Sequence, residues 1–414
     1  MRRLCIAALA LTATFSPGQA LAAGWDGSQE LTSASSWPIA LAGNEHGRRV
    51  VAWAEPSGVH AVVAPRGHRF TRARTIAGPD QKYDAQAAVD ERGDIAFVWR
   101  YFTGEEPPDE AYLGDPGCCW NVQGAILRRD GRLIHRTDLG IRGQGNLAPL
   151  LRADSRGHLA LAFVSGNVFA RFGTMRDGFG KLHRMTAYSR AAGQIVSVGH
   201  GRVIYTTTDY PNPLTIEAWR TIKGGFAHKV LLGFSISPQQ IGTADSGRQI
   251  GAWDSGVTAA RTPPRAIHTS DRRTSGSTTV TGVAGTGAAV IGWQVEPRGG
   301  SDMDREARLM ATVRRPDSVF STPLVLDRYV VGQYQELQPL SVDAAANGAA
   351  VVGAVIRHGR DSAETRAYLV PRTGGKRTRL LVSRDSGSIA VLRDARGTVA
   401  VAATSHGFLA RWRR

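Results

Sequence analysis

The feature that most constrains the fold is a short pattern that returns about every fifty residues. Its clearest copy, AAVDERGDIAFVWR at 87–100, has an apolar run, a polar turn that ends in glycine, and a second alternating apolar run. Asp or Asn caps such a turn with its own side chain, and glycine adopts a positive φ without steric cost. Each copy therefore predicts a β-hairpin. The eight hairpin glycines are Gly47, Gly93, Gly157, Gly201, Gly247, Gly287, Gly348 and Gly397.

Two further strand-like runs follow the hairpin in most units, for example 59–67 and 68–77 in the first. Four short strands per unit, with period-two alternation and turn residues between them, are typical of propeller blades. We therefore predict an all-β, eight-bladed β-propeller with four-stranded antiparallel blades and the first strand innermost. Seven blades, a parallel solenoid and two stacked sandwiches are the alternatives.

The two ends of the chain complement each other. The eighth unit stops at Arg414 after three runs, and GWDGSQELTS at 24–33 fits the missing fourth run. In that fit Trp25 takes the place of Phe226 or Phe320 in other units. We predict that this N-terminal strand pairs with the last blade and closes the ring, which removes exposed strand edges. Residues 24–414 are then a single domain.

Residues 1–23 have the pattern of a signal peptide. Arg2 and Arg3 precede an apolar run, and Ala20-Leu21-Ala22 supplies the small residues of a cleavage site. The apolar run is shorter than the ~20 residues that a membrane-spanning helix needs. We expect a secreted protein, extracellular or periplasmic, that is monomeric and has no membrane span.

The order and spacing of the runs resemble those of secreted bacterial proteins with repeated V-D-x-x-G-x-A-x-x-x-W units, a poorly characterised β-propeller group. The resemblance covers residues 24–414 and implies the fold, but that group has no agreed activity. Sialidase-like propellers place a tryptophan three residues after the turn glycine. Here Trp53 and Trp99 come six residues after theirs. The turn aspartates are therefore predicted to be structural.

Loop lengths predict where a ligand binds. The long insertions, 101–120 and 295–307, both join second to third strands, and units two and six lie opposite each other in an eight-fold ring. We expect a binding or scaffold module whose ligand lies at this face. The alternative is an enzyme that acts on an extracellular glycan or small molecule at the channel mouth, with insertion carboxylates as acid and base. The ligand-binding candidates are Glu105, Glu106, Asp109, Tyr112, Asp115, Trp120, Asp302 and Asp304.

Charge is distributed unevenly along the repeat. The net charge is +16, and arginines gather at the short turns of the face opposite the insertions. This basic face is predicted to attract an anionic cell-envelope polymer or glycan, or to form a solvated rim; no nucleic-acid partner is expected. The turn arginines are Arg48, Arg49, Arg92, Arg156, Arg202, Arg248 and Arg396, with Arg66, Arg128, Arg129, Arg314, Arg315 and Arg372 near the turns between third and fourth strands.

Motifs for metals and cofactors are missing from the sequence. The histidines lack zinc spacing, and the acidic stretch 301–304 lacks the glycine and distal glutamate of a calcium loop. We expect no cofactor and no metal. Cys118 and Cys119 are candidates for an adjacent-cysteine disulfide, with two free thiols as the alternative.

Overall fold

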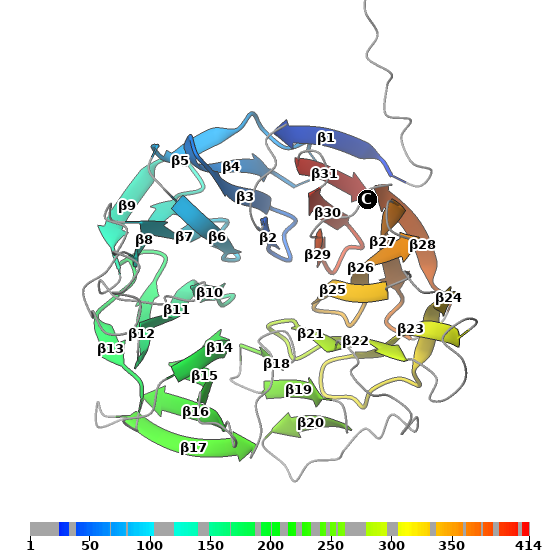
Figure 1. Cartoon of the computed structure of the whole chain (residues 1–414). Helices are drawn as coiled ribbons and strands as arrows, with labels where there is room; N and C mark the ends of the chain where they lie inside the picture. Colours follow the sequence, from blue (N-terminus) through cyan, green and yellow to red (C-terminus); the bar gives the residue numbers. More distant parts are fainter. Residues whose placement is uncertain are drawn as a thin grey trace, which may run out of the picture.

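The structure is a computed structural model in which the described residues form eight separate antiparallel β-sheets. Seven of these sheets have four strands and one has three. Figure 1 shows the sheets side by side in a ring around a central opening. The structure describes residues 25–32, 39–66, 68–79, 82–102, 120–139, 149–165, 167–186, 192–199, 201–207, 214–220, 226–232, 241–245, 249–253, 256–260, 279–295, 305–331, 337–358, 362–373, 376–383, 389–404 and 408–413.

Strands follow one another outward in each of the first seven sheets. The first three sheets contain β2 (Ala40–Gly43), β3 (Arg49–Glu55), β4 (Gly58–Ala64) and β5 (Arg74–Ala77); β6 (Lys82–Val89), β7 (Ile95–Phe102), β8 (Trp120–Leu127) and β9 (Leu133–Asp138); and β10 (Leu150–Ala153), β11 (His158–Ser165), β12 (Asn167–Thr174) and β13 (Leu182–Arg184). The next two contain β14 (Ala192–Gly199), β15 (Arg202–Thr207), β16 (Thr215–Arg220) and β17 (Phe226–Leu232); and β18 (Ile241–Thr243), β19 (Gln249–Trp253) and β20 (Gly256–Ala260). The sixth and seventh contain β21 (Thr279–Val283), β22 (Ala289–Val295), β23 (Arg305–Arg314) and β24 (Leu324–Val331); and β25 (Leu337–Ala344), β26 (Ala350–His358), β27 (Ser362–Val370) and β28 (Thr378–Ser383).

The repeated hairpin joins the first and second strands of a sheet, as predicted. In the turn between β6 and β7, Asp90 accepts a hydrogen bond at 2.8 Å from the backbone N–H of Asp94, and Gly93 has φ of 88°. Asp154 and Asp394 cap their own turns with the same contact. The turn aspartates are therefore structural. Of the eight predicted glycines, Gly247 lies outside the described residues, and the other seven have positive φ.

The core lies between neighbouring sheets. The second strands carry continuous apolar runs because sheets pack against both of their faces, and β22 is buried along its whole length. Phe97 and Trp99 of β7, for example, pack with Ala52 of β3 and Val59 of β4 in one cluster. This packing sets the sheets upright around the opening, so that only their innermost strands face it (Figure 1).

The N-terminal strand lies on the sheet formed by the end of the chain. β1 (Gly27–Thr32) pairs antiparallel with β31 (Phe408–Arg413), which continues to β30 (Val399–Thr404) and β29 (Ile389–Arg393). Trp25 is only 6% exposed, and its indole N–H donates to the Leu381 carbonyl at 2.7 Å. The strand predicted from GWDGSQELTS is therefore present (Figure 1). Trp25 anchors it between the last two sheets.

The innermost strands form a continuous series. Each contacts the next in chain order from β2 to β29, and β29 contacts β2. In the part of the chain that the structure describes, no helix has the length and apolar character to cross a membrane.

Candidate functional site

Most of the site residues predicted from the long insertions cannot be placed. Trp120 is described, whereas the other candidates lie outside the described residues. These are Glu105, Glu106, Asp109, Tyr112, Asp115, Asp302, Asp304 and the cysteine pair Cys118 and Cys119. The carboxylates of the enzymatic alternative are among them, so the structure adds no geometry to that alternative.

Trp120 belongs to a cluster of aromatic rings and one cation at the loop-bearing end of the second sheet. Its ring lies 5.1 Å from that of Tyr83 and 5.3 Å from that of Phe102, measured between centroids. The Arg100 guanidinium lies 4.8 Å from the Trp120 ring. All four side chains are partly exposed. Such a cluster presents flat apolar faces together with a positive charge.

A buried carboxylate holds the arginine of this cluster in position. Arg100 forms an ion pair with Asp84, which adopts φ of 51°, a region that non-glycine residues rarely occupy. The register of β6 against β7 shifts between Tyr83 and Gln86, beside this residue. The unusual backbone conformation of Asp84 therefore occurs at the residue that pairs with Arg100 beside Trp120. Trp120 could be identified from the sequence, whereas its partners could not, because the register shift depends on strand pairing.

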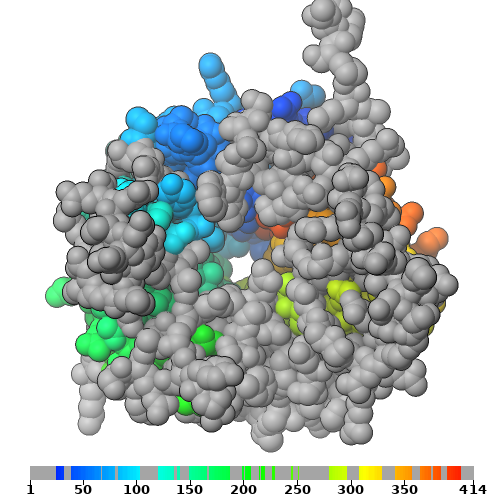
Figure 2. Space-filling view, in the orientation of Figure 1, coloured from blue at the N-terminus to red at the C-terminus, as the bar shows by residue number. Residues whose placement is uncertain are grey.

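A cavity of about 860 Å³ lies at the opposite, hairpin-turn end of the central opening. It is lined by the innermost strands and the turns that follow them, and Figure 2 shows the molecule hollowed at its centre. Charged and polar side chains from several sheets line it. The charged or titratable ones are Glu45, Glu91, Arg152, Asp154, Arg156, His158, Asp245, Asp343 and Arg393. The ligand site predicted from the sequence lies at the opposite face, which carries the 101–120 and 295–307 insertions. No sequence motif indicates this cavity.

Glu45 connects the turns of three sheets at the edge of this cavity. It lies in the turn after β2 and accepts backbone hydrogen bonds from Ala346 at 2.8 Å and from Ala395 at 2.7 Å. Those residues lie in the turns after β25 and β29. Burial raises the pKa of Glu45, although the two backbone hydrogen bonds oppose the shift. One carboxylate therefore joins the start of the chain to its last two hairpins.

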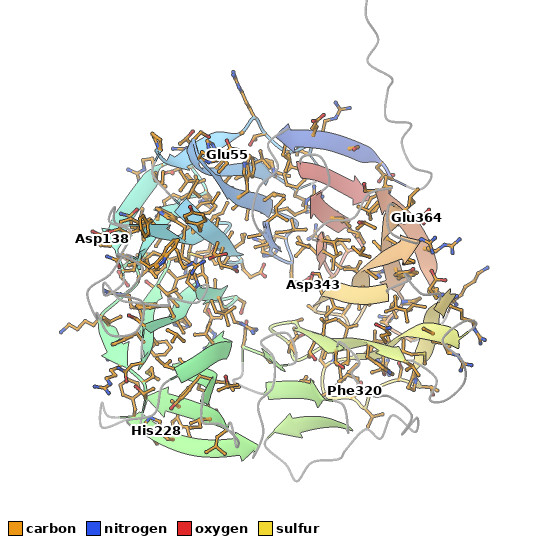
Figure 3. All side chains as sticks on the ribbon, viewed as in Figure 1. Glu55, Asp138, His228, Phe320, Asp343 and Glu364 are labelled. Carbon is orange, nitrogen blue, oxygen red and sulfur yellow. The ribbon has the colours of Figure 1, made fainter. Side chains whose placement is uncertain are left out.

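Asp343 lies in β25 on the wall of the cavity, and Figure 3 shows it at the edge of the central opening. One of its carboxylate oxygens accepts the backbone N–H of Arg393 at 2.8 Å. Burial raises the pKa of Asp343 to about 7, and the negative charge of Glu45 adds to the effect. An acid with this pKa changes its charge near neutral pH, in contrast to a solvent-exposed aspartate.

Arg152 lies in β10 and lines both this cavity and a smaller one of about 400 Å³ beside it. Its closest carboxylate is Asp245, at 3.9 Å between the guanidinium nitrogen and the carboxylate oxygen. The other oxygen of Asp245 accepts the backbone N–H of Ser155 at 3.0 Å. Burial lowers the pKa of Arg152. Among the described residues, its guanidinium makes this long ion pair and no hydrogen bond.

The predicted basic face needs one correction. Arg92, Arg156 and Arg396 are exposed at short turns, as expected, but Arg49 and Arg314 are each only 3% exposed. Both begin or end a central strand, and their guanidinium groups lie over Phe70 at 5.6 Å and Phe320 at 5.9 Å, respectively. These two side chains are buried against aromatic rings at strand ends. They are therefore not part of the exposed basic face.

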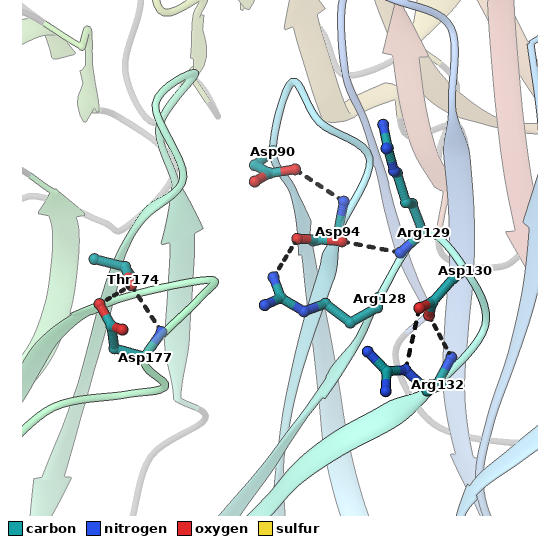
Figure 4. A network of polar contacts seen from close by, with 8 residues as sticks. All are labelled: Asp90, Asp94, Arg128, Arg129, Asp130, Arg132, Thr174 and Asp177. Carbon is teal, nitrogen blue, oxygen red and sulfur yellow. Dashed lines mark hydrogen bonds and ion pairs between the residues drawn. The ribbon is translucent and has the colours of Figure 1, made fainter.

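Carboxylates near the turn after β8 offset part of the positive charge of this face. Asp94 accepts hydrogen bonds from the Arg128 guanidinium at 2.6 Å and from the Arg129 backbone N–H at 2.9 Å (Figure 4). Asp130 pairs with Arg132 in the same turn. The basic face is therefore weaker than a count of its arginines indicates. The described residues contain no group of three His, Cys, Asp or Glu side chains that could hold a metal ion.

Comparisons with known proteins give no relative by sequence. No protein-family model matches the chain, and no curated protein does. Among solved structures, yeast Sqt1 (Saccharomyces cerevisiae) matches with a TM-score of 0.49 and 9% identity over 95% of this chain and 99% of its own. The WD40 domain of fission-yeast SCAP matches with a TM-score of 0.48 and 11% identity over 93% and 94%. Inactive virginiamycin B lyase from Staphylococcus aureus, solved with quinupristin, matches with a TM-score of 0.43 and 7% identity over 94% and 98%. These similarities are too low to indicate an activity.

Proposed function

We propose that this protein is a secreted, eight-bladed β-propeller that closes through its N-terminal strand and acts as a binding or scaffold module. Three observations support the blade count and the closure. The described strands form eight sheets, their innermost strands contact one another in chain order, and β1 pairs with β31. Export rests on the signal-peptide pattern of residues 1–23. N-terminal sequencing of the protein from the medium or periplasm should find a start near residue 24, and an intact Met1 would contradict export by this route.

The ligand is proposed to bind at the loop-bearing face, between the 101–120 and 295–307 insertions. The observation that carries this proposal is the partly exposed cluster of Trp120, Tyr83, Phe102 and Arg100. Aromatic faces of this kind pack on the apolar faces of sugar rings, and the guanidinium pairs with carboxylate or phosphate groups. The ligand class that fits is an anionic glycan or cell-envelope polymer.

The test is the binding of the mature protein to a panel of neutral and acidic glycans. Trp120→Ala should weaken binding about tenfold, because a stacked ring contributes about 1 kcal/mol beyond its buried area. Trp219→Ala is the matched control, since Trp219 also lies beside an arginine, Arg202, at 6.0 Å. Those two residues pair at the hairpin-turn end of β15 and β16, away from the proposed site. Equal affinities of the two variants would contradict the proposed location.

A further inference from the structure

One position of the repeat, five residues before the hairpin glycine, lies near the end of the innermost strand, and in five units it lines the cavity. In six units this position is small or apolar, whereas in units three and seven it is Arg152 and Asp343. The six uncharged equivalents are Ala42, Ala88, Val196, Gly242, Gly282 and Leu392. The repeat itself therefore requires no charge here, and the two charged copies call for a separate explanation.

Arg152 and Asp343 carry opposite charges and lie on opposite sides of the ring. Arg152 and Asp343 are the next-to-last residues of β10 and β25, and Figure 1 shows these strands on opposite sides of the central opening. Both side chains line the same cavity of about 860 Å³. That volume lies within the range of small-molecule sites, which is roughly 300–1,000 Å³.

Neither charge makes a close side-chain ion pair among the described residues, although Asp154 adds a second negative charge near Arg152. Arg152 has a carboxylate at 3.9 Å, beyond hydrogen-bond distance, and its planar group is suited to a bidentate carboxylate. Asp343 accepts one backbone hydrogen bond and has no cationic side chain paired with it among the described residues. Withdrawing charged groups from water is costly unless partners replace the water. A ligand that carries both charges would supply both partners.

We propose that the cavity binds a small zwitterion of the amino-acid or short-peptide class. The carboxylate of the ligand pairs with Arg152, and its ammonium group pairs with Asp343 on the opposite wall. This site lies at the hairpin-turn end of the channel and is independent of the glycan site proposed around Trp120.

The test is calorimetric titration of the mature protein with glycine and its linear oligomers up to pentaglycine. The pH is 7.5, because the α-amino group of an oligopeptide loses its proton at about pH 8. Acetate and methylamine are titrated alongside, because each carries one of the two charges. At least one oligomer should bind with a 1:1 stoichiometry and at least tenfold more tightly than acetate or methylamine. Absence of binding by every oligomer, or equally tight binding of acetate, would overturn the proposal.

Variants connect the binding to the two residues. Arg152→Gln and Asp343→Asn should each weaken the binding of the best oligomer at least tenfold, whereas Arg396→Gln, an exposed arginine outside the cavity, should leave it unchanged. Arg152→Lys covers the case in which the glutamine variant does not fold. It keeps the charge and loses the bidentate geometry, so weaker binding is expected and unchanged binding would overturn the assignment. Glycan binding by Arg152→Gln should equal that of the wild type, which separates this site from the one at Trp120.

Discussion

Asp343→Asn should make the protein more stable in alkaline solution and leave it almost unchanged in acid. The folded protein holds the pKa of Asp343 at about 7, compared with 3.8 for an unperturbed aspartate. The folded state therefore binds this proton more tightly than the unfolded state does. Stability is highest below about pH 4 with respect to this group, and it falls as the pH rises through 7.

The size of the effect follows from the shift. Three pKa units correspond to about 4 kcal/mol, and because the carboxyl group is partly open to the cavity we expect about 1–2 kcal/mol. Asparagine is neutral at every pH, and its carbonyl oxygen can still accept the Arg393 N–H. At pH 8.5 the variant should thus be about 1–2 kcal/mol more stable than the wild type. At pH 4 the difference should nearly vanish.

Urea unfolding at pH 4, 6 and 8.5 measures the difference in the free energy of unfolding between the two proteins. Asp130→Asn serves as the control, because the backbone N–H of Arg132 lowers the pKa of this exposed group, so any effect has the opposite sign. A stability difference that does not change with pH, or an Asp343→Asn protein less stable at pH 8.5, would refute the reasoning. A stabilising change that removes ligand binding would show that the charge is kept for function.

Three other substitutions test the hairpins and the seam between the chain ends, each by urea unfolding. Glu45→Ala leaves two backbone N–H groups without their acceptor and should cost about 2–3 kcal/mol; a loss below 0.5 kcal/mol would contradict its bridging role. Trp25→Ala removes a buried indole and its bond to Leu381, with an expected cost of about 3–5 kcal/mol, and a neutral result would argue against anchoring. Gly93→Ala should cost about 1–3 kcal/mol because φ is 88°, whereas Gly78→Ala has open space and should be nearly neutral.

The hairpins could be predicted because their determinants are local. A cap such as Asp90 and a glycine such as Gly93 are three residues apart, so the turn is visible in a few letters of sequence. The pairing of β1 with β31 was also predictable, since one strand was missing at one end of the chain and present at the other. Trp120 could be identified from its place at the end of a long insertion.

The cavity and its charges could not be predicted in the same way. Glu45 lies in an ordinary turn, and its role arises only because turns about 300 and 350 residues later meet it. Arginine is usually exposed, so the sequence predicts Arg49 and Arg314 at the surface, but neighbouring strands bury both side chains. The sequence shows that Arg152 and Asp343 occupy the same position of the repeat. A role in binding can be inferred only from the structure, in which the innermost strands line one cavity.

Hydrogen–deuterium exchange of the intact protein, compared with a chain that lacks residues 1–32, tests the closure of the ring most directly. We expect slow exchange in 27–32 and 408–413 of the intact protein, because the two strands pair from Gly27 with Trp412 to Thr32 with Phe408. Deletion should expose the outer edge of 408–413 and accelerate its exchange. Exchange of 27–32 at the rate of an unstructured peptide, or unchanged protection of 408–413 after deletion, would contradict a ring closed by its first strand.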